Sequence, residues 1–301
     1  MSCLLSTPLS VRPFVGEAGE PCLTVDGVSG FDVGKTFDCG QCFRFDPVGS
    51  SAHRVEYGGV INGRYVTVAQ DEPHALTLHN VTEADFDGFF RHYLTLDTDY
   101  RALEERILAT VPGEVMERAV ACGSGIRILR QEGFETLCSF ILSQNNNIPR
   151  IKKLIEAICR AYGRPFTDGY GLHYAFPSPE ELSRATEAEL RALSVGFRAP
   201  YLVDAARKWA EGQMDPLILR DGDYETAEAM LTSIRGVGPK VAACTLLFGF
   251  GHTEAFPVDV WIKKVLNVYF GGTFPVASLG DAAGLAQQYL FYLGRYSDRL
   301  K

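Results

Sequence analysis

The sequence predicts an α+β protein with an antiparallel β-sheet domain at residues 1–105 and an all-α domain at residues 106–301. Two observations lead to this division. The first hundred residues contain short segments rich in β-branched and aromatic residues, which are separated by Gly or Asn-Gly. From about Tyr100 onward, apolar residues recur instead at three- and four-residue spacing, which is typical of amphipathic helices.

Individual elements follow from the same patterns. Strands are expected at residues 51–57, 59–61 and 63–70, because Asn62-Gly63 between the last two is a strong hairpin signal. A helix is expected at residues 83–95, where aromatic side chains fall at helical spacing and would form a core face. Further helices are expected at residues 103–108, 134–142, 148–162, 187–193, 201–209, 225–234, 241–250, 260–269 and 282–293.

Composition limits the classes of function. The 301 residues carry a net charge of −8, which by itself argues against binding nucleic acid. The segment from Asn145 to Arg164 is nevertheless basic, with five Lys or Arg residues against Glu156 alone. No apolar run approaches the roughly 18–20 residues of a membrane helix, and the N-terminus lacks a secretory signal. We therefore expect an intracellular protein without membrane contact, in the cytoplasm or nucleoid of a prokaryote or the nucleus of a eukaryote.

The eight cysteines are scattered singly, apart from Cys39 and Cys42 in one CxxC pair. No second Cys pair or His pair accompanies them at zinc-ligand spacing. We therefore expect free thiols in a reducing compartment, no metal site and no cofactor.

The segment from Glu225 to Gly249 predicts a helix, a tight turn and a second helix. Gly236 and Gly238 permit a sharp turn and a close approach of another molecule, and Pro239 suits the first turn of the second helix. Backbone N–H groups at that helix start can bind a DNA phosphate without reading sequence. An ordinary helix connection is the alternative. The apolar Ile234 before the glycines, Val237 between them and the Lys-Val-Ala-Ala helix after them favour a helix-hairpin-helix.

Lys240 follows this turn directly. Most helical lysines are solvated surface cations, but this one lies in the first helical turn, where the helix dipole disfavours the charged form. A neutral amine there can act as a nucleophile. Cys244 lies four residues on and therefore shares its helical face, either as a small buried residue or as a partner of Lys240 in a pocket.

Asp259 stands just before another helical pattern, in Phe256-Pro-Val-Asp259-Val-Trp. Its structural interpretation is a helix N-cap, which Asp often supplies. A carboxylate fixed at a helix start is also rigid and ionised, as stabilising an oxocarbenium-like sugar requires. The two interpretations are compatible.

Gly-Val-Gly-Pro-Lys240, followed about 20 residues later by Pro-Val-Asp259, resembles the helix-hairpin-helix/Gly-Pro-Asp superfamily of DNA glycosylases. Within it, the chain is similar to the 8-oxoguanine DNA glycosylase/AP lyases. The motifs that carry this resemblance are Gly40-Gln-Cys-Phe-Arg-Phe45, Asn145-Asn-Asn-Ile-Pro-Arg-Ile151, Gly196-Phe-Arg-Ala199 and Ala286-Gln-Gln-Tyr-Leu-Phe291. They occur in order from about residue 35 to 291. The resemblance implies a TATA-binding-protein-like N-terminal sheet domain before the helical glycosylase domain.

The resemblance also implies roles for residues. Lys240 would attack the sugar C1′, expel the oxidised base and form a Schiff base, and Asp259 would stabilise the developing positive charge. Gly40 would accept the N7 hydrogen that distinguishes 8-oxoguanine from guanine. Gln287 would read the Watson–Crick edge of the flipped base, between Phe291 and Cys244. Strand cleavage by β-elimination would follow in base excision repair.

Duplex DNA containing oxidised guanine opposite cytosine is the partner that the resemblance implies, with the protein acting as a monomer. Asn145 would fill the gap left by the flipped base, with Arg150 and Arg198 assisting and Phe197 wedged into the stack. The hairpin residues Gly236, Val237 and Gly238 would grip phosphate. The chain departs from the family pattern at two of these positions, because Trp261 stands where many members have a phosphate-contacting His and Phe197 where many have Tyr.

Three alternative interpretations fit the sequence less well. The endonuclease III and adenine glycosylase branches commonly carry an iron–sulfur loop after the Asp, but no cysteine follows Cys244. An alkylpurine glycosylase would need Asp259 but not Lys240. A non-catalytic DNA-binding module would need neither residue, because gripping phosphate requires only the hairpin.

Overall fold

The computed structural model describes residues 8–49 and 52–296. Two predictions fall partly outside these ranges. The predicted lack of a secretory signal rests partly on residues 1–7, and the predicted strand at 51–57 begins at a residue that is not described. The strands are β1 (Ser10–Val15), β2 (Pro21–Asp26), β3 (Phe45–Pro47), β4 (Val55–Ile61), β5 (Arg64–Gln70), β6 (Ala75–His79), β7 (Pro165–Asp168) and β8 (Gly171–Tyr174). No helix of the described ranges is long and apolar enough to span a membrane.

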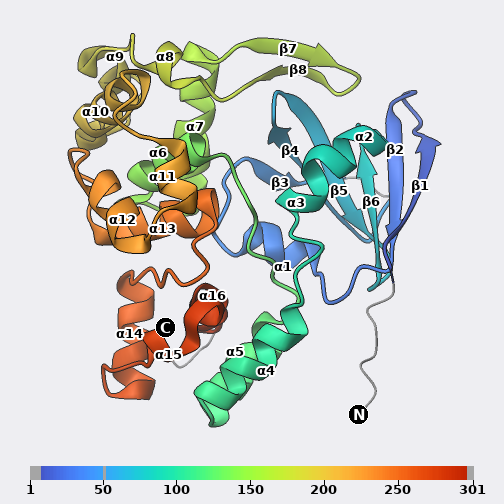
Figure 1. Ribbon diagram of the computed structural model, residues 1–301. Coiled ribbons are helices and arrows are strands. Elements are labelled where there is room, and N and C mark those ends of the chain that lie inside the picture. Colours follow the sequence, from blue (N-terminus) through green and yellow to red (C-terminus); the bar gives the residue numbers. More distant parts are fainter. Residues whose placement is uncertain (1–7, 50–51, 297–301) are drawn as a thin grey trace.

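The helices and single helical turns follow in chain order. They are α1 (Val33–Asp38), α2 (Glu83–Asp85), η1 (Phe86–Phe90), α3 (Arg91–Tyr93), α4 (Tyr100–Thr110), α5 (Glu114–Gly123), α6 (Gly133–Ser143), α7 (Ile148–Tyr162), α8 (Pro179–Leu182), α9 (Glu187–Ala192), η2 (Gly196–Arg198), α10 (Ala199–Ala210), α11 (Pro216–Asp221), α12 (Tyr224–Thr232), α13 (Pro239–Thr245), η3 (Leu246–Phe250), α14 (Val260–Phe270), α15 (Val276–Leu279), η4 (Gly280–Ala282) and α16 (Ala283–Tyr296). Figure 1 places the sheet on one side of the molecule and most helices on the other.

The N-terminal part is a six-stranded antiparallel sheet in the order β1-β2-β6-β5-β4-β3. The predicted hairpin is confirmed, since Asn62 and Gly63 both have positive φ (48° and 72°) between β4 and β5. The predicted helix at 83–95 is present as α2, η1 and α3. Its buried aromatics Phe86, Phe90 and Tyr93 join α1 and the inward side chains of β2, β5 and β6 in one core.

A second core fills the helical part and is built around α6. Within α6, every residue except Glu135 and Ser143 is buried, because the helix is surrounded by α7, α10, α13 and η3. Helices α14 and α16 pack against each other, and α16 also packs against α5; Figure 1 shows this group below the bundle around α6. The predicted boundary at 105/106 falls inside α4, and both Tyr100 and Ile107 of α4 belong to this helical core.

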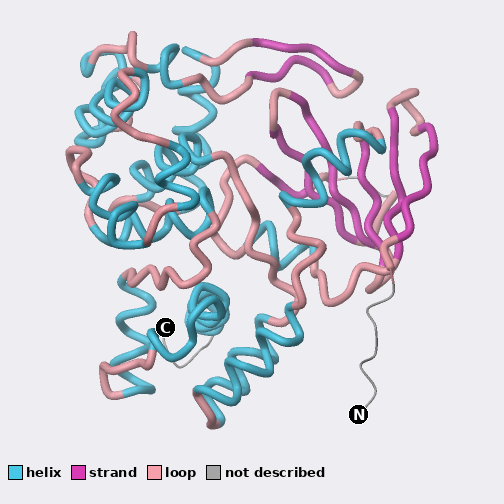
Figure 2. The backbone as a smooth tube through the Cα atoms, viewed as in Figure 1, coloured by secondary structure: helices cyan, strands magenta, loops and turns pink. Residues whose placement is uncertain are grey.

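The α+β fold class is confirmed, with one addition that the periodicity did not predict. The strands β7 and β8 form a hairpin within the helical part, visible in Figure 2 as the magenta pair that extends toward the sheet. It contacts β5, where the rings of Tyr65 and His173 stack with centroids 4.5 Å apart. Strands of four residues give too short a pattern for periodicity to separate them from a loop.

Candidate active site and DNA-binding surface

A pocket of about 410 Å³ lies where the loop after α1, the end of α6 and the helices α13, α14 and α16 meet. Seven of the residues singled out in the sequence line it: Gly40, Lys240, Cys244, Asp259, Trp261, Gln287 and Phe291. They come from segments as distant as residues 40 and 291. The fold therefore brings together side chains that the sequence could connect only by resemblance.

Lys240 is the second residue of α13 and is half-buried. Its Nζ donates a hydrogen bond to Ser143 Oγ (3.4 Å) at the end of α6. The same ammonium lies 5.0 Å from the centroid of the Phe140 ring. The amine is thereby held at the pocket wall rather than extended into solvent, which distinguishes it from an ordinary surface lysine. Ser143 and Phe140 directly precede the Asn145 motif in the sequence, but no role was predicted for either.

Cys244 lies one turn further along α13 and is 4% exposed. Burial raises the pKa of its thiol; the negative charge of Asp259 acts in the same direction, while Lys240 opposes it. The thiol therefore stays neutral at physiological pH and offers a small, uncharged surface to the pocket.

Asp259 caps α14, as its sequence context predicted. Its Oδ1 accepts a hydrogen bond from the Ile262 backbone N–H (2.8 Å), and its backbone is extended. The carboxylate is thus fixed in direction by the helix start while it faces the pocket. Two residues on, Trp261 is 37% exposed, with the ammonium of Lys264 5.9 Å from its ring centroid.

Gly40 follows α1 in a left-handed conformation (φ 79°), which glycine adopts without strain. The adjacent Gln41, for which the sequence predicted no role, is 1% exposed. Its Nε2 donates to the carbonyls of Arg127 (2.7 Å) and Thr36 (2.9 Å), and its Oε1 accepts from the Leu129 N–H (2.9 Å). Gln41 therefore anchors the Gly40 loop to the segment that connects the two cores.

Gln287 and Phe291 lie one turn apart on α16 and face the same pocket. Gln287 is 5% exposed, and its Oε1 is buried with no hydrogen-bond donor among the described residues. A buried, unpaired acceptor is costly, at about 1–3 kcal/mol. Its position in a pocket indicates that a ligand supplies the missing donor.

The three consecutive asparagines between α6 and α7 each make a different local contribution. Asn145 adopts the left-handed conformation (φ 48°) and is exposed. Asn146 Nδ2 donates to the Leu142 carbonyl (2.9 Å), and Asn147 caps α7 by accepting from the Arg150 N–H (3.1 Å). Caps and a turn explain Asn146 and Asn147, and both also line the pocket.

Arg198 is 2% exposed and so is not the solvated arginine that its residue type suggests. It donates to three backbone carbonyls, those of Gln144, Asn145 and Val195. Burial lowers the pKa of its guanidinium, as does the nearby Arg150. These contacts hold the Asn145 turn in place from within the protein.

Phe197 lies beside this turn and is 46% exposed, with the Arg198 guanidinium 4.4 Å from its ring centroid. Arg150 is exposed and donates to the Ser194 carbonyl (3.4 Å). Neither residue lines the pocket. An exposed ring and an exposed arginine next to Asn145 form a surface that can meet a DNA strand.

The basic segment at 145–164 is less available to DNA than its composition suggested. Three of its five basic side chains form ion pairs within the protein: Lys152 with Asp46 (2.7 Å), Arg160 with Glu156 (2.7 Å) and Arg164 with Glu181 (3.6 Å). Their charge is partly neutralised, so this segment contributes less to a basic footprint.

The helix-hairpin-helix formed by α12 and α13 has the turn that the glycines predicted. Gly236 has φ 75°, and a Cβ there would lie 2.4 Å from the Tyr201 ring. Val237 is buried beneath the turn. Gly238 differs, because its φ of −101° suits any residue and a Cβ there would meet no heavy atom within 4 Å. The protein interior requires Gly236, whereas nothing within the described residues requires Gly238.

Comparison with known proteins decides the family. The sequence model for the 8-oxoguanine DNA glycosylase N-terminal domain matches residues 26–137, and that for the HhH-GPD superfamily of base excision DNA repair proteins matches residues 138–273. N-glycosylase/DNA lyase OGG1 of Arabidopsis thaliana is 31% identical over 289 residues, which cover 85% of this chain and 75% of that protein. The chain belongs to the 8-oxoguanine DNA glycosylase family.

Other relatives agree with this assignment. N-glycosylase/DNA lyase of Saccharomyces cerevisiae is 44% identical over 154 residues, 47% of this glycosylase and 41% of the yeast protein, so the match spans less than half of that relative. The solved structure of MBOgg1 with a low affinity DNA ligand superposes with a TM-score of 0.87 at 36% identity, covering 96% of this chain and 99% of that one. The structure of Clostridium acetobutylicum 8-oxoguanine glycosylase/lyase with double-stranded DNA containing cytosine opposite 8-oxoguanine gives 0.84 at 32% identity, covering 95% and 97%. The chain is therefore a DNA glycosylase that also has lyase activity and acts in base excision repair.

Proposed function

We propose that this glycosylase excises 8-oxoguanine paired with cytosine from duplex DNA through a covalent Lys240 intermediate, and then cleaves the strand by β-elimination. The observation that carries the proposal is the convergence of Lys240 and Asp259 on one pocket with Gly40, Gln287 and Phe291. A pocket recessed between helices is reached by a base only after it has been flipped out of the duplex.

The chemistry assigns separate tasks to Lys240 and Asp259. The neutral amine of Lys240 attacks C1′ while the glycosidic bond breaks, and the electron pair of that bond leaves with the base. Asp259, fixed by its cap bond to Ile262, lies at the pocket wall where its negative charge opposes the positive charge developing on the sugar. After the attached amine loses a proton to solvent, the lone pair on Nζ breaks the C1′–O4′ bond, and O4′ takes up a proton, which gives a protonated Schiff base. Removal of a C2′ proton from this Schiff base then breaks the C3′–O bond, and the 3′ phosphate leaves with the electron pair of that bond.

Recognition of the oxidised base rests on unpaired or neutral groups around the pocket. Gly40, whose backbone is turned by its positive φ, would accept the N7–H that guanine lacks. An acceptor facing the lone pair of guanine N7 would instead cost about 1–3 kcal/mol. The unpaired Oε1 of Gln287 would accept from the Watson–Crick edge of the base. Phe291 and the neutral Cys244 would enclose its two faces.

Contacts to the duplex are assigned to the surface around Asn145. Its exposed side chain would enter the gap left by the base and meet the orphaned cytosine, with Phe197 in the stack beside it. Arg150 would assist from the surface, whereas Arg198 acts as a positioning residue through its bonds to Gln144 and Asn145. The turn at Gly236, Val237 and Gly238, together with Trp261, would contact phosphate.

Borohydride trapping tests the covalent step. Wild-type protein is incubated with duplex containing 8-oxoguanine opposite cytosine, and reduction should yield one protein–DNA adduct. Lys240→Gln should give none, whereas the matched variant Lys263→Gln, at an exposed lysine of α14, should give as much as wild type. An adduct that survives Lys240→Gln would refute the nucleophile. Base release without any wild-type adduct would refute the Schiff base while leaving the glycosylase assignment intact.

A further inference from the structure

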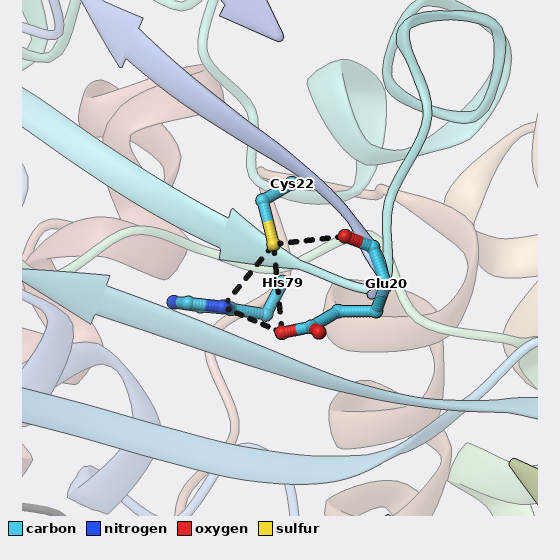
Figure 3. A group of neighbouring side chains, drawn as sticks. All are labelled: Glu20, Cys22 and His79. Atoms are coloured by element: carbon cyan, nitrogen blue, oxygen red, sulfur yellow. Dashed lines mark hydrogen bonds and ion pairs between the residues drawn. The ribbon is translucent and has the colours of Figure 1, made fainter. Parts of the chain in front are cut away.

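We propose that Glu20, Cys22 and His79 form a binding site for a thiolate-preferring divalent transition-metal ion of the Zn²⁺ class, separate from the excision pocket. Figure 3 shows the three side chains turned toward one another at one end of the sheet. None of them lines the pocket that contains Lys240. No spacing in the sequence marks the site, because His79 lies 57 residues beyond Cys22.

The strand register creates the site. Cys22 of β2 and His79 of β6 are direct cross-strand partners, so their side chains project from the same face of the sheet. Glu20 precedes β2 and is fixed by the Ala18 N–H, which donates to its Oε2 (3.0 Å). The cluster is shielded from water, since Cys22 is 1% exposed and the side chains of Glu20 and His79 are 10% and 17% exposed.

The distances between the three ligand atoms agree with a tetrahedral ion. Typical Zn–S, Zn–N and Zn–O bonds give separations of about 3.6 Å from sulfur to either partner and about 3.4 Å from nitrogen to oxygen. Cys22 Sγ lies 3.6 Å from Glu20 Oε1 and 3.3 Å from His79 Nδ1, and His79 Nδ1 lies 3.3 Å from Glu20 Oε1. Three protein ligands leave the fourth position of the tetrahedron to water. Binding releases the Cys22 thiol proton to solvent, and the thiolate forms the bond to the ion.

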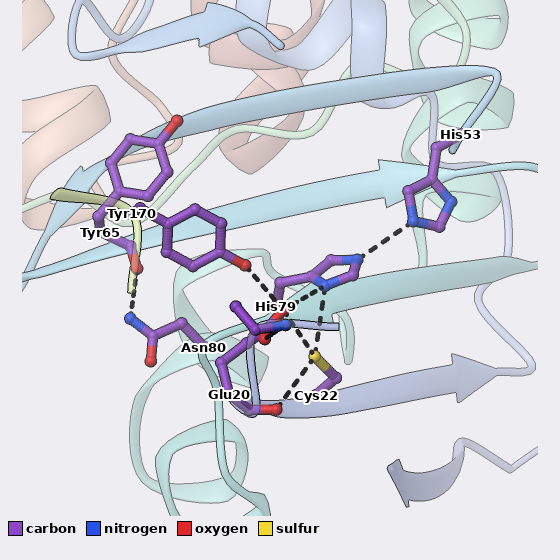
Figure 4. Close-up of polar contacts among 8 residues, drawn as sticks. Glu20, Cys22, His53, Tyr65, His79, Asn80 and Tyr170 are labelled. Carbon is purple, nitrogen blue, oxygen red and sulfur yellow. Dashed lines mark hydrogen bonds and ion pairs between the residues drawn. The ribbon is translucent and has the colours of Figure 1, made fainter. Parts of the chain in front are cut away.

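The surrounding hydrogen bonds orient the ligands as metal sites require. A metal-bound histidine donates its other ring N–H to a partner, and His79 Nε2 lies 3.1 Å from His53 Nε2 (Figure 4). His53 Nδ1 in turn lies 2.7 Å from Asp71 Oδ2. In this relay His79 donates to His53 and His53 donates to Asp71, which leaves the lone pair of His79 Nδ1 directed at the ion.

Tyr170 connects the site to the helical part of the protein. Its hydroxyl donates to Glu20 Oε1 (3.0 Å), and it lies in the turn between β7 and β8. Figure 4 shows its ring above the cluster, beside Tyr65. An ion bound here would hold the start of β2, the end of β6 and this hairpin together. Its effect would therefore be on stability rather than on excision.

The choice of ion follows from ligand chemistry. Thiolate and imidazole suit Zn²⁺, Co²⁺ and similar ions, whereas Mg²⁺ and Ca²⁺ prefer oxygen ligands only. Titration of the reduced, chelator-treated full chain with Co²⁺ should give one equivalent of binding with a thiolate-to-cobalt charge-transfer absorption. Zn²⁺ should abolish that absorption by displacement, and Mg²⁺ and Ca²⁺ should leave it unchanged.

Variants locate the binding. Cys22→Ser and His79→Gln should lose the absorption, while Cys122→Ser, at a cysteine outside the cluster, should retain it. His53→Gln should weaken Co²⁺ binding about 10–100-fold while keeping the same spectrum, because it removes only the partner of a ligand. Zn²⁺ should raise the Tm of the wild type but not that of His79→Gln. Excision should be unchanged in all four.

Three outcomes would overturn the proposal. Wild-type protein without a Co²⁺ absorption would mean that the three side chains form a hydrogen-bonded cluster only. An absorption that persists in Cys22→Ser would place the metal elsewhere in the chain. If Cys22→Ser fails to fold, Glu20→Gln provides the same test, since loss of the carboxylate should weaken Co²⁺ binding at least about tenfold. Unchanged binding in Glu20→Gln would count equally against the site.

Discussion

Replacing Gly238 with Ser tests whether the turn between α12 and α13 grips DNA through its backbone. The protein itself accommodates the change, because the φ of −101° suits any residue and the space around a Cβ is open. Serine also supplies the side-chain cap that α13 does not have. The free energy of unfolding should therefore stay unchanged or rise by up to about 1 kcal/mol.

DNA binding should change in the opposite direction. A Cβ at position 238 would project where the phosphate approaches, and the serine hydroxyl would occupy a helix N–H otherwise free for phosphate. Loss of one hydrogen bond to a charged group costs about 1.5–3 kcal/mol, which corresponds to an increase in Kd of about 10–150-fold. Chemical denaturation measures the first quantity, and fluorescence anisotropy with a labelled duplex at fixed salt measures the second.

Gly236→Ala is the matched control on the same turn. It places a side chain at φ 75° and brings a Cβ within 2.4 Å of the Tyr201 ring. The left-handed backbone costs about 1–2 kcal/mol and the overpacking about 1–3 kcal/mol, so this variant should unfold earlier. Binding of DNA by Gly238→Ser within twofold of wild type would refute a backbone grip on phosphate at this turn, as would a loss of stability equal to that of Gly236→Ala.

Three further substitutions test the roles of Asp259, Gln287 and Glu135. Asp259→Asn retains the helix cap, so the free energy of unfolding should change by less than about 0.5 kcal/mol. The single-turnover rate of excision should fall about 10²–10³-fold, and an unchanged rate would mean that Asp259 serves only as a helix cap. Gln287→Leu removes an unpaired buried acceptor, so this variant should be at least as stable as wild type, and a clear loss of stability would contradict the absence of a partner within the protein. In competition assays the variant should lose its preference for 8-oxoguanine over guanine. Glu135 is half-buried, and the partial loss of hydration raises the pKa of its carboxyl from 4.5 to about 7 even though the Arg44 guanidinium lies 3.7 Å away. Between these values the folded state holds more protons than the unfolded chain, so the free energy of unfolding should fall as pH rises from about 4.5 to about 7. Glu135→Gln should flatten that slope in denaturation series, and an unchanged slope would show that Glu135 does not cause it.

Much of the architecture was predictable from local sequence. The turn at Asn62-Gly63, the helix start at Asp259 and the turn at Gly236 depend on residues within one or two turns of each other. Their conformations follow from backbone dihedral preferences and capping, which neighbouring residues determine. The hairpin of β7 and β8 was missed because four-residue strands carry too little periodicity.

The roles of single side chains were harder to predict, because burial depends on residues distant in the sequence. The residue type of Arg198 suggests an exposed side chain, yet Arg198 is buried and donates a hydrogen bond to the Asn145 carbonyl. Gln41 reads as a polar loop residue, yet it is buried and holds the Gly40 loop in place. A motif marks such residues without saying whether they touch DNA or the protein.

The sequence by itself determined the fold class, the tight turn between α12 and α13 and the selection of Lys240 and Asp259 as site candidates, since each rests on local pattern or on a motif. Tertiary structure alone decided that Gly40, Gln287 and Phe291 share a pocket with them. It also decided that Cys22 and His79 lie side by side on adjacent strands. The physical reason is that local dihedral and hydrogen-bond preferences form the elements, whereas burial of apolar surface between distant elements sets which side chains meet.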